Sequence, residues 1–385
     1  MRSWSAIFAA TLLVLSAMAV AGRDGRQSLS VIWERDLGKL IHESPGAGAH
    51  HHAVFELKIS DDDRWIGVDV VADRTTMWEG QHHHLLLLPL NSINNAFEQY
   101  EFQQSRGSEE DFFLSGDGGL VLIQDGPAIR LEDRRLHSSC SLFPADVSEV
   151  LSPGGFMNEG LFVATRWYPR SVHASARYEV YEPDCKLVGA WELKGGNPAT
   201  TWPGEGHLFI RRYMTGTTWE TLLVEWPSWK TINRWSFEKG GLVADAGRVL
   251  CGMFLSDHFQ CRDMATEAPL ANPLVVHYGK PMSTSRSGTL ALGTDWFALW
   301  KPFTEGEHWA HVKRQVLWDF RSGAVVDSWV PESQNGDPSS LRSMGPAIRP
   351  FPFMCSLSST GAFLVEGGNE TIRVFRVNRG MRSTR

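Results

Sequence analysis

Two short stretches of the sequence place three histidines directly before an apolar run. The first, "GAHHHAVFEL", begins at Gly48, and the second, "GQHHHLLLLPL", begins at Gly80. Neutral imidazoles are ligands for zinc, copper or nickel, and residues two positions apart on a strand project to one side. The candidate metal ligands are therefore His50, His52, His82 and His84, with Glu79 as a candidate acid or base.

Three tryptophans define a second group of candidate site residues. The segments "TMWEG", "TTWET" and "EHWAH" each place an indole next to or near a carboxylate. An exposed indole offers a flat apolar face and one hydrogen-bond donor, which suits sugar or peptide binding. The candidate binding residues are Trp78, Glu79, Trp219, Glu220, His308 and Trp309.

The elements that must position these residues are predicted to be β-strands. Helical periodicity is hard to find, whereas short β-branched and aromatic runs bounded by Gly, Pro, Asp and Ser recur throughout. Turns followed by an apolar strand are marked by Asp63, Gly118, Gly160, Gly206, Gly247, Gly288 and Gly361. Most of these markers are separated by roughly 40 to 55 residues, near the period of propeller blades. The sequence thus predicts an all-β, seven-bladed β-propeller of four-stranded antiparallel blades.

The predicted blades 1, 6 and 7 resemble WD40 proteins. "GAHHHAVFELKISDDD" has a histidine, an apolar strand and a turn serine in the order of that family, with His50 and Ser60 at the matching positions. "QVLWDFRSGAVVDSW" supplies the pair Trp318 and Asp319, and "CSLSSTGAFLVEGGNETIRVFRV" repeats the rhythm of turn and strand. The resemblance implies a propeller without a specific function, and it implies that His50 joins a structural hydrogen-bond network. The segment "SLSVIWERDLG" is expected to close the ring by pairing with the last blade.

The polarity of propeller strands predicts where the histidines lie. The loop before the first strand of a blade and the loop between its second and third strands share one face, the top face. Both histidine triplets of blade 1 are therefore expected there, roughly 9 to 10 Å apart between backbones. The leucines fit an interior strand that neighbouring blades cover on both sides.

Composition limits the classes of function. The chain has 385 residues, 42% of them hydrophobic and 21% charged, and a formal net charge of -7. These values indicate a globular protein and argue against nucleic acid as a principal partner. The N-terminal segment "MRSWSAIFAATLLVLSAMAVA" is typical of a secretory signal peptide, and no other apolar stretch approaches membrane length. We therefore expect a signal peptide at 1–21, a propeller at 28–378 and a basic tail at 379–385, in a monomer exported to the periplasm or outside the cell.

Cysteine spacing gives one weak signal. Five cysteines are widely spaced, without a C-x-x-C pair. Cys251 and Cys261 could form a disulfide across a hairpin, and the odd count leaves at least one thiol.

Three hypotheses about function remain open from the sequence. The leading one is a non-catalytic module without a cofactor, which binds a protein, peptide or carbohydrate through its top-face loops. The alternative is a metal-dependent hydrolase or lyase acting on a sugar or lactone, with a divalent ion such as zinc. The third is a binding face that senses pH through its histidines. Solvated strand ends are favoured over a preformed metal site for the histidine triplets, because a metal site also needs supporting contacts.

Overall fold

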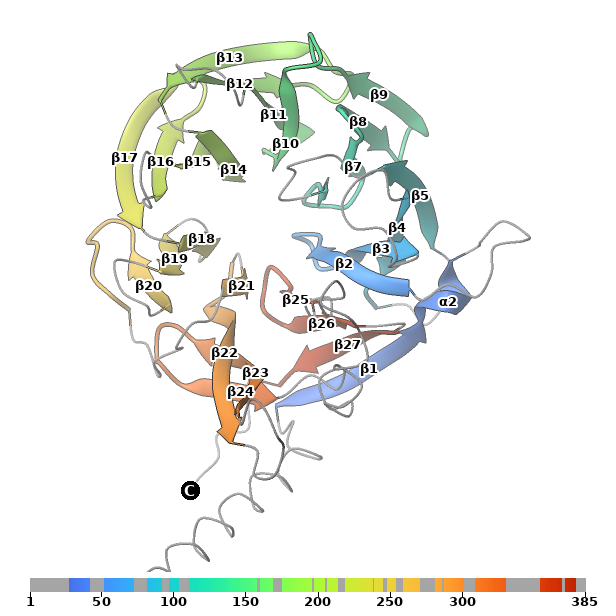
Figure 1. Cartoon of the computed structure of the whole chain (residues 1–385), viewed down its shortest axis with the longest axis vertical. Helices are drawn as coiled ribbons and strands as arrows, with labels where there is room; N and C mark the ends of the chain where they lie inside the picture. Colours follow the sequence, from blue (N-terminus) through green and yellow to red (C-terminus); the bar gives the residue numbers. More distant parts are fainter. Residues whose placement is uncertain are drawn as a thin grey trace, which may run out of the picture.

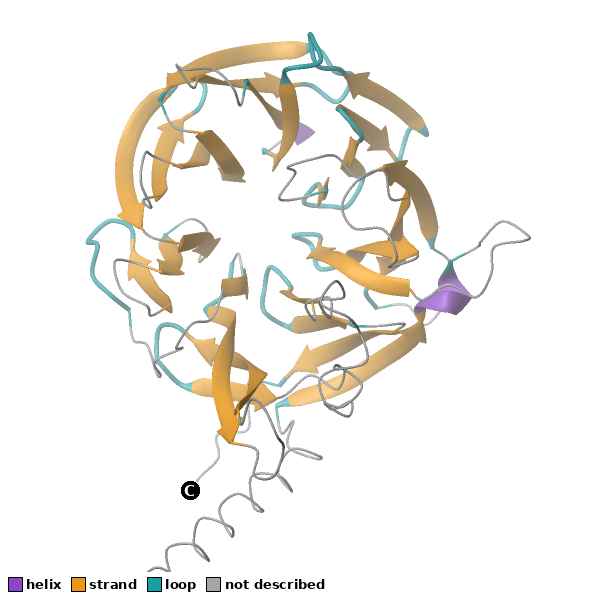
Figure 2. Ribbon diagram, in the orientation of Figure 1, coloured by secondary structure: helices purple, strands orange, loops and turns teal. Residues whose placement is uncertain are grey.

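The described part of the chain is almost entirely β-strand, and its sheets form a ring (Figures 1 and 2). The computed structural model describes residues 28–41, 52–72, 82–91, 97–103, 111–157, 160–168, 175–195, 197–204, 206–213, 219–237, 239–244, 248–253, 259–270, 281–285, 287–300, 309–329, 354–368 and 371–378. The predicted signal peptide and basic tail lie outside these residues. Among the described residues no helix is long and apolar enough to cross a membrane.

Blade 1 shows the architecture that the other blades repeat. Its strands, in order from the centre of the ring outward, are β2 (His52–Ile59), β3 (Trp65–Ala72), β4 (His82–Pro89) and β5 (Glu98–Gln103), each antiparallel to its neighbour. The turn between β2 and β3 is built by Ser60, whose hydroxyl accepts a hydrogen bond from the Trp65 amide at 3.0 Å. Asp63 has a positive φ of 56° in this turn, a conformation that Asp tolerates better than most residues. The "SDDD" signal in the sequence therefore marks a real turn.

Four more blades of this kind and one smaller sheet continue the ring. Blade 2 contains β6 (Phe112–Leu114), β7 (Leu120–Asp125), β8 (Ala128–Asp133) and β9 (Ser138–Leu142); blade 3 contains β10 (Val150–Phe156), β11 (Phe162–Trp167), β12 (Ser175–Tyr181) and β13 (Leu187–Lys194); blade 4 contains β14 (Asn197–Gly204), β15 (His207–Tyr213), β16 (Trp219–Glu225) and β17 (Lys230–Phe237). The β18–β20 sheet contains β18 (Lys239–Ala244), β19 (Val249–Met253) and β20 (Phe259–Asp263), and the β21–β24 blade contains β21 (Pro281–Thr284), β22 (Leu290–Trp300), β23 (Trp309–Asp319) and β24 (Val325–Trp329).

The closing blade joins the two ends of the propeller. Its strands are β25 (Met354–Leu357), β26 (Phe363–Gly367), β27 (Thr371–Val377) and, outermost, β1 (Leu29–Asp36), which is antiparallel to β27. After β1 the chain forms the short helix α2 (Leu37–Leu40) and continues to blade 1. The Trp33 indole, on β1, donates a hydrogen bond of 2.8 Å to the carbonyl of Leu90, just after β4. The expected closure by an N-terminal strand is thus confirmed.

The described residues contain six four-stranded blades, one fewer than the sequence predicts. Between blade 4 and the β21–β24 blade the structure describes three strands, β18 to β20, instead of four. The spacing of turns carries no information about how many strands follow each turn.

Among the described residues, seven hydrophobic clusters hold the sheets together, one between each neighbouring pair. The run of leucines on β4 shows how. Leu85 and Leu87 pack against blade 2, whereas Leu86 and Leu88 pack against the closing blade. All four are fully buried, which explains why this strand is continuously apolar instead of alternating.

Two disulfides add covalent links. Cys251 and Cys261 lie directly opposite each other on β19 and β20, as the sequence suggests. Cys140 of β9 is joined to Cys185, in the turn between β12 and β13, so this second bond connects blades 2 and 3. Cys355 is buried as a thiol.

Candidate functional site

The second histidine triplet begins β4 and alternates between the two faces of blade 1. His82 is exposed, His83 is fully buried and His84 is half-buried. His83 lies on the face that packs against blade 2, together with Leu85, so His82 and His84 point the other way. The expectation that His82 and His84 share a face is consistent with this arrangement, but the buried imidazole is the one between them.

His83 contacts a buried carboxylate. Its Nδ1 lies 2.9 Å from each carboxylate oxygen of Asp69, on β3, and both side chains are fully buried. The rings of Phe55 and Phe102 lie 5.4 and 5.0 Å from the imidazole. Burial raises the pKa of Asp69, and the neighbouring His83 opposes that rise. The pair is therefore a polar contact inside an apolar interface.

A third ionisable side chain comes from the next blade. Asp111, directly before β6, is buried, and its carboxylate, that of Asp69 and the imidazole of His83 each offer a ligand atom within 4.8 Å of the other two. The Asp111 amide donates a hydrogen bond of 2.9 Å to the carboxylate of Glu56, on β2. Lys58, also on β2, lies 3.1 Å from the other oxygen of Glu56. We call these five residues the blade 1–2 cluster.

Sequence reasoning missed the centre of this cluster. It selected His82 and His84 by their spacing and left out His83. One signal was present: Asp69 is the only charged residue in "WIGVDVVA", the apolar segment that forms β3. A lone carboxylate in a strand covered on both faces needs a buried partner.

The remaining predicted metal ligands are only partly described. His84 Nδ1 lies 3.1 Å from the amide nitrogen of Gln99 and 3.9 Å from the carboxylate of Glu101, both on β5. His52 is the first residue of β2 and pairs with Ala72 at the end of β3, the same edge of the blade at which His82 begins β4. His50 lies outside the described residues.

Of the predicted binding residues, the structure describes Trp219, Glu220 and Trp309. Trp219 is the first residue of β16 and Trp309 the first of β23, so each begins the third strand of its blade, as His82 does in blade 1. Because strand order and direction repeat from blade to blade, these three positions lie at the same face of the ring. Trp78, Glu79 and His308 lie outside the described residues.

Glu220 is held inside blade 4. Its side chain is 7% exposed and one oxygen lies 2.6 Å from both Nε and Nη2 of Arg212, while the other lies 3.1 Å from Nε of Arg234. Arg212 also donates hydrogen bonds to the carbonyls of Lys194 and Gly195, at the end of blade 3. In this position Glu220 connects strands within blade 4 and supports the contact with blade 3.

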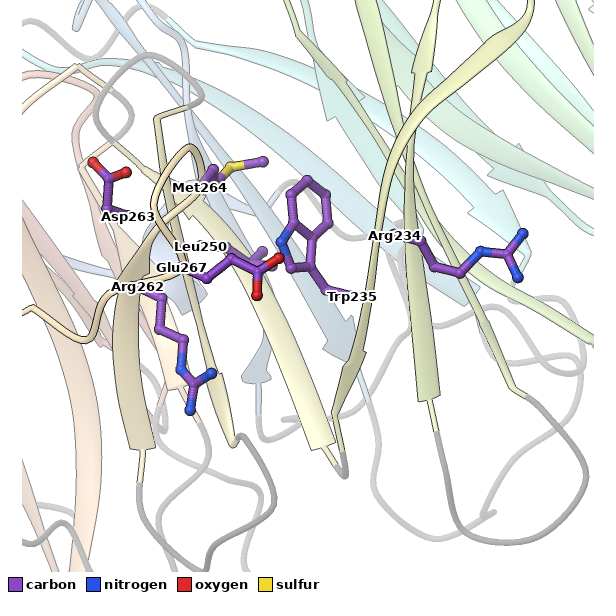
Figure 3. Close-up of a pocket in the computed structure, with 7 residues that line it drawn as sticks. All are labelled: Arg234, Trp235, Leu250, Arg262, Asp263, Met264 and Glu267. Atoms are coloured by element: carbon purple, nitrogen blue, oxygen red, sulfur yellow. The ribbon is translucent and has the colours of Figure 1, made fainter.

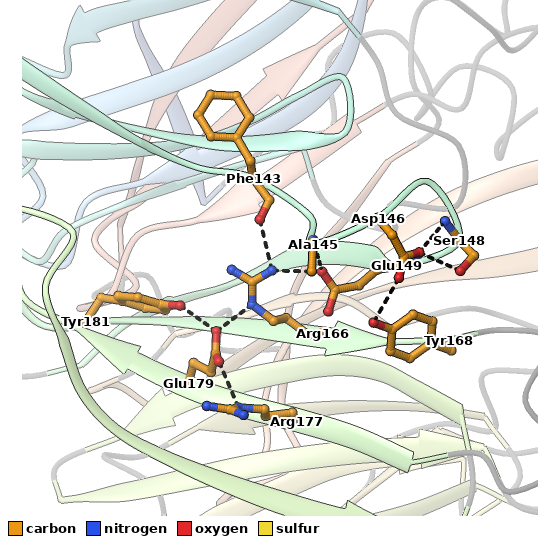
Figure 4. A network of polar contacts seen from close by, with 10 residues as sticks. All are labelled: Phe143, Ala145, Asp146, Ser148, Glu149, Arg166, Tyr168, Arg177, Glu179 and Tyr181. Carbon is orange, nitrogen blue, oxygen red and sulfur yellow. Dashed lines mark hydrogen bonds and ion pairs between the residues drawn. The ribbon is translucent and has the colours of Figure 1, made fainter.

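A second ionic network connects the loop after blade 2 with blade 3 (Figure 4). Arg166, on β11, lies between two acids: its Nε donates to Glu179 at 2.6 Å and its Nη1 to Glu149 at 2.9 Å. Nη1 also donates to the carbonyl of Phe143, a residue that is 67% exposed. Although burial of Arg166 opposes it, bonding to Glu179 and Tyr181 raises the pKa of this guanidinium, which keeps its charge. The network fixes the loop that carries Phe143.

A small pocket lies between blade 4 and the β18–β20 sheet (Figure 3). Its volume is about 140 Å³, and it is lined by Arg234, Trp235, Leu250, Arg262, Asp263, Met264 and Glu267. Asp263 accepts hydrogen bonds from the amide and hydroxyl of Thr266, which lower its pKa and form the turn after β20. The pocket includes none of the predicted site residues.

Comparisons with known proteins give no family. No known protein family matches the sequence, and no curated protein matches it. One similar solved structure is prolyl oligopeptidase B from Galerina marginata, bound to a 35-residue substrate of hydrolysis and macrocyclization. It is 8% identical with a TM-score of 0.49, and the match covers 73% of this chain and 42% of that chain. The chain thus spans less than half of the length of that protein, and we draw no functional conclusion from the match.

Proposed function

We propose that this protein is an exported, non-catalytic β-propeller that binds a protein, peptide or carbohydrate through the face at which His52, His82, Trp219 and Trp309 begin their strands. The observation that carries the proposal is the common position of His82, Trp219 and Trp309. They begin the third strands of three separate blades, so these three strand ends lie at the same end of the ring. A rigid ring with radial loops suits recognition of a ligand larger than one side chain.

The use of the polar groups within the blades supports a binding role. Glu220 pairs with Arg212 and Arg234, Glu179 pairs with Arg166, and Asp63 accepts hydrogen bonds from the closing blade. These groups connect strands and blades. Such contacts stiffen a scaffold, and a stiff scaffold lowers the entropy lost when its loops bind a ligand.

The β18–β20 sheet is, in our proposal, the seventh blade. β18 lies toward the centre of the ring and contacts β21, as other innermost strands contact their neighbours. On the outer side, Pro269 forms an antiparallel bridge with Arg262, and the Leu270 amide donates to the carbonyl of Cys261 at 2.8 Å. This segment lies where the outer strand of a blade is expected.

We also propose the relation to WD40 proteins and the export of the chain. Trp318 and Asp319 end β23, a third strand, and Asp319 accepts hydrogen bonds from the following turn. That position agrees with the tryptophan and aspartate of the family resemblance. The two disulfides are consistent with an oxidising compartment.

The test is binding by the full chain, produced with its signal segment and purified without a tag. Arrays of oligosaccharides and peptides are probed with the wild type, Trp219→Ala, Trp309→Ala and a control, His137→Ala. His137 is exposed in the turn between β8 and β9, at the opposite end of the strands. We expect a bound ligand whose affinity falls at least about tenfold in both tryptophan variants and is unchanged in the control.

Two outcomes contradict the proposal. One is metal-dependent hydrolysis or elimination of a sugar or lactone by the wild type. The other is ligand binding that is insensitive to both tryptophan substitutions, which moves the binding surface away from this face.

A further inference from the structure

We propose that the blade 1–2 cluster binds a divalent transition-metal ion, with zinc as the probe, through His83, Asp69 and Asp111. These ligands differ from the four histidines that the sequence suggests. They come from β3, β4 and the residue before β6, so a bound ion would connect blade 1 with blade 2.

The donor set is appropriate for such an ion. One imidazole and two carboxylates, each with a ligand atom within 4.8 Å of the other two, combine nitrogen and oxygen donors. Zinc binds both donor types, and carboxylates also suit manganese. All three side chains are at least nine-tenths buried, so they are already desolvated and close to one another.

The contact between Asp69 and His83 places two donor atoms at a spacing that suits neighbouring metal ligands. Nδ1 of His83 lies 2.9 Å from both oxygens of Asp69, which is close to the separation of two donors that each lie roughly 2.0 to 2.2 Å from one zinc ion. Nδ1 of His83 and a carboxylate oxygen of Asp69 are thus the two ligands from blade 1, and Asp111 supplies a carboxylate from blade 2.

The charges of the cluster favour a cation at the ligand atoms. Lys58 pairs with Glu56 at 3.1 Å, whereas Asp69 and Asp111 each place a carboxylate oxygen within 4.8 Å of the other's and of an imidazole nitrogen of His83. Two carboxylates that share a buried site repel each other, and a bound cation lowers that cost.

The experiment measures metal in the refolded full chain. Because the ligands are buried, the ion is expected to enter during folding. The protein, with its disulfides intact, is unfolded in urea with a chelator and refolded with ZnCl₂ or without metal. Unbound metal is then removed, and elemental analysis gives the zinc content. We expect about one zinc per chain, and a rise in Tm of roughly 3 to 4 °C at a free zinc concentration of 100 times Kd.

Two variants and one control assign the ion to this cluster. Asp111→Asn keeps the size of the side chain and removes its charge, and His83→Gln removes the imidazole. Each is expected to lower zinc affinity by at least about tenfold. The control, His82→Gln combined with His84→Gln, removes the other two imidazoles of the same triplet and is expected to keep the ion.

A spectroscopic measurement on the wild type covers the case in which a variant does not fold. Refolding with Co²⁺ is expected to give visible absorption bands that zinc abolishes by competition. The proposal is overturned if the wild type takes up neither zinc nor cobalt, because the cluster is then a polar contact between the blades that needs no metal. It is also overturned if Asp111→Asn keeps the zinc while the control loses it, because the exposed histidines would then hold the ion.

Discussion

Nδ1 of His83 lies 2.9 Å from both carboxylate oxygens of Asp69, and neither side chain reaches solvent. The two residues come from adjacent strands of blade 1 and face blade 2. Because the two buried side chains are in direct contact, their contributions to stability should be coupled.

A double-mutant cycle should reveal this coupling. We expect Asp69→Leu and His83→Leu each to lower the free energy of unfolding by about 3 kcal/mol, because each leaves a polar group buried beside an apolar one. The double variant should lose less than the sum, by at least about 1 kcal/mol. Urea unfolding in the presence of a chelator measures all four proteins. His82→Leu, at an exposed position, should change stability by less than about 0.5 kcal/mol; additive losses at positions 69 and 83 would contradict the coupling.

Glu220 allows a structural role to be separated from a role in binding. Replacing it with Gln leaves Arg212 buried next to a neutral group. We expect the free energy of unfolding, measured with urea, to fall by roughly 3 kcal/mol. Lysine replacement of Arg234, which is 59% exposed, serves as a milder control and should cost less than about 1 kcal/mol. A Glu220→Gln protein that keeps its stability but loses a ligand would return this residue to the binding surface.

Much of the fold could be predicted from local sequence, because the signals concerned were local. The turn at Ser60, the apolar run from Leu85 to Leu88 and the hairpin that joins Cys251 to Cys261 all lie within short segments. Closure of the ring by β1 followed from the need to cover a free strand edge. These features do not depend on how neighbouring blades fit together.

The parts that could not be predicted depend on contacts between blades. Alternation predicts that His83 faces away from His82 and His84, but it does not say which face meets an acid from the next blade. Asp111 is 28 positions after His83, and Cys185 is 45 positions after Cys140. Both pairs come together only when two blades pack, so no spacing rule within one blade could find them.

The disulfide between blades 2 and 3 should contribute more to stability than the one on β19 and β20. It closes a loop of 45 residues, against 10 for Cys251 and Cys261. In the chain-entropy account the longer loop contributes about 4 kcal/mol and the shorter about 3. Paired Cys→Ser variants, compared by urea unfolding without reductant, should therefore differ by about 1 kcal/mol. Equal losses, or a larger loss for the short loop, would rule out loop entropy as the main cause.

Glu98 should contribute stability near neutral pH that is lost when its carboxylate is protonated in acid. Hydrogen bonds from Arg134, at 2.6 and 2.8 Å, and from Tyr100 lower the pKa of Glu98. A depressed pKa in the folded state contributes stability that is present above the unfolded value of about 4.3 and is lost as pH falls through the folded value. The wild type should thus lose more stability than Glu98→Gln between about pH 5 and pH 3.

The matched control for Glu98 is Arg134→Met, which removes the main cause of the shift. In that background Glu98→Gln should alter the pH dependence much less. Thermal unfolding at several pH values measures the slopes. Parallel curves for the wild type and Glu98→Gln would show that the ion pair does not contribute through protonation.

Gly67 lies in close contact with blade 2. A methyl group at this position of β3 would lie 2.3 Å from Cε2 of Phe112, on β6, which no relaxed structure allows. We expect Gly67→Ala to lower the free energy of unfolding, measured with urea, by about 1 to 3 kcal/mol. Gly293→Ala provides the comparison. Its methyl group would lie 3.2 Å from the ring of Trp318, a contact that small shifts of the indole can relieve.

A double variant tests whether the contact with Phe112 is the cause. Phe112→Leu should make room for the methyl group that Gly67→Ala adds, so the double variant should lose at least about 1 kcal/mol less free energy of unfolding than the sum of the two single changes. If instead the losses simply add, the strain comes from the backbone of β3 and not from the contact between the blades.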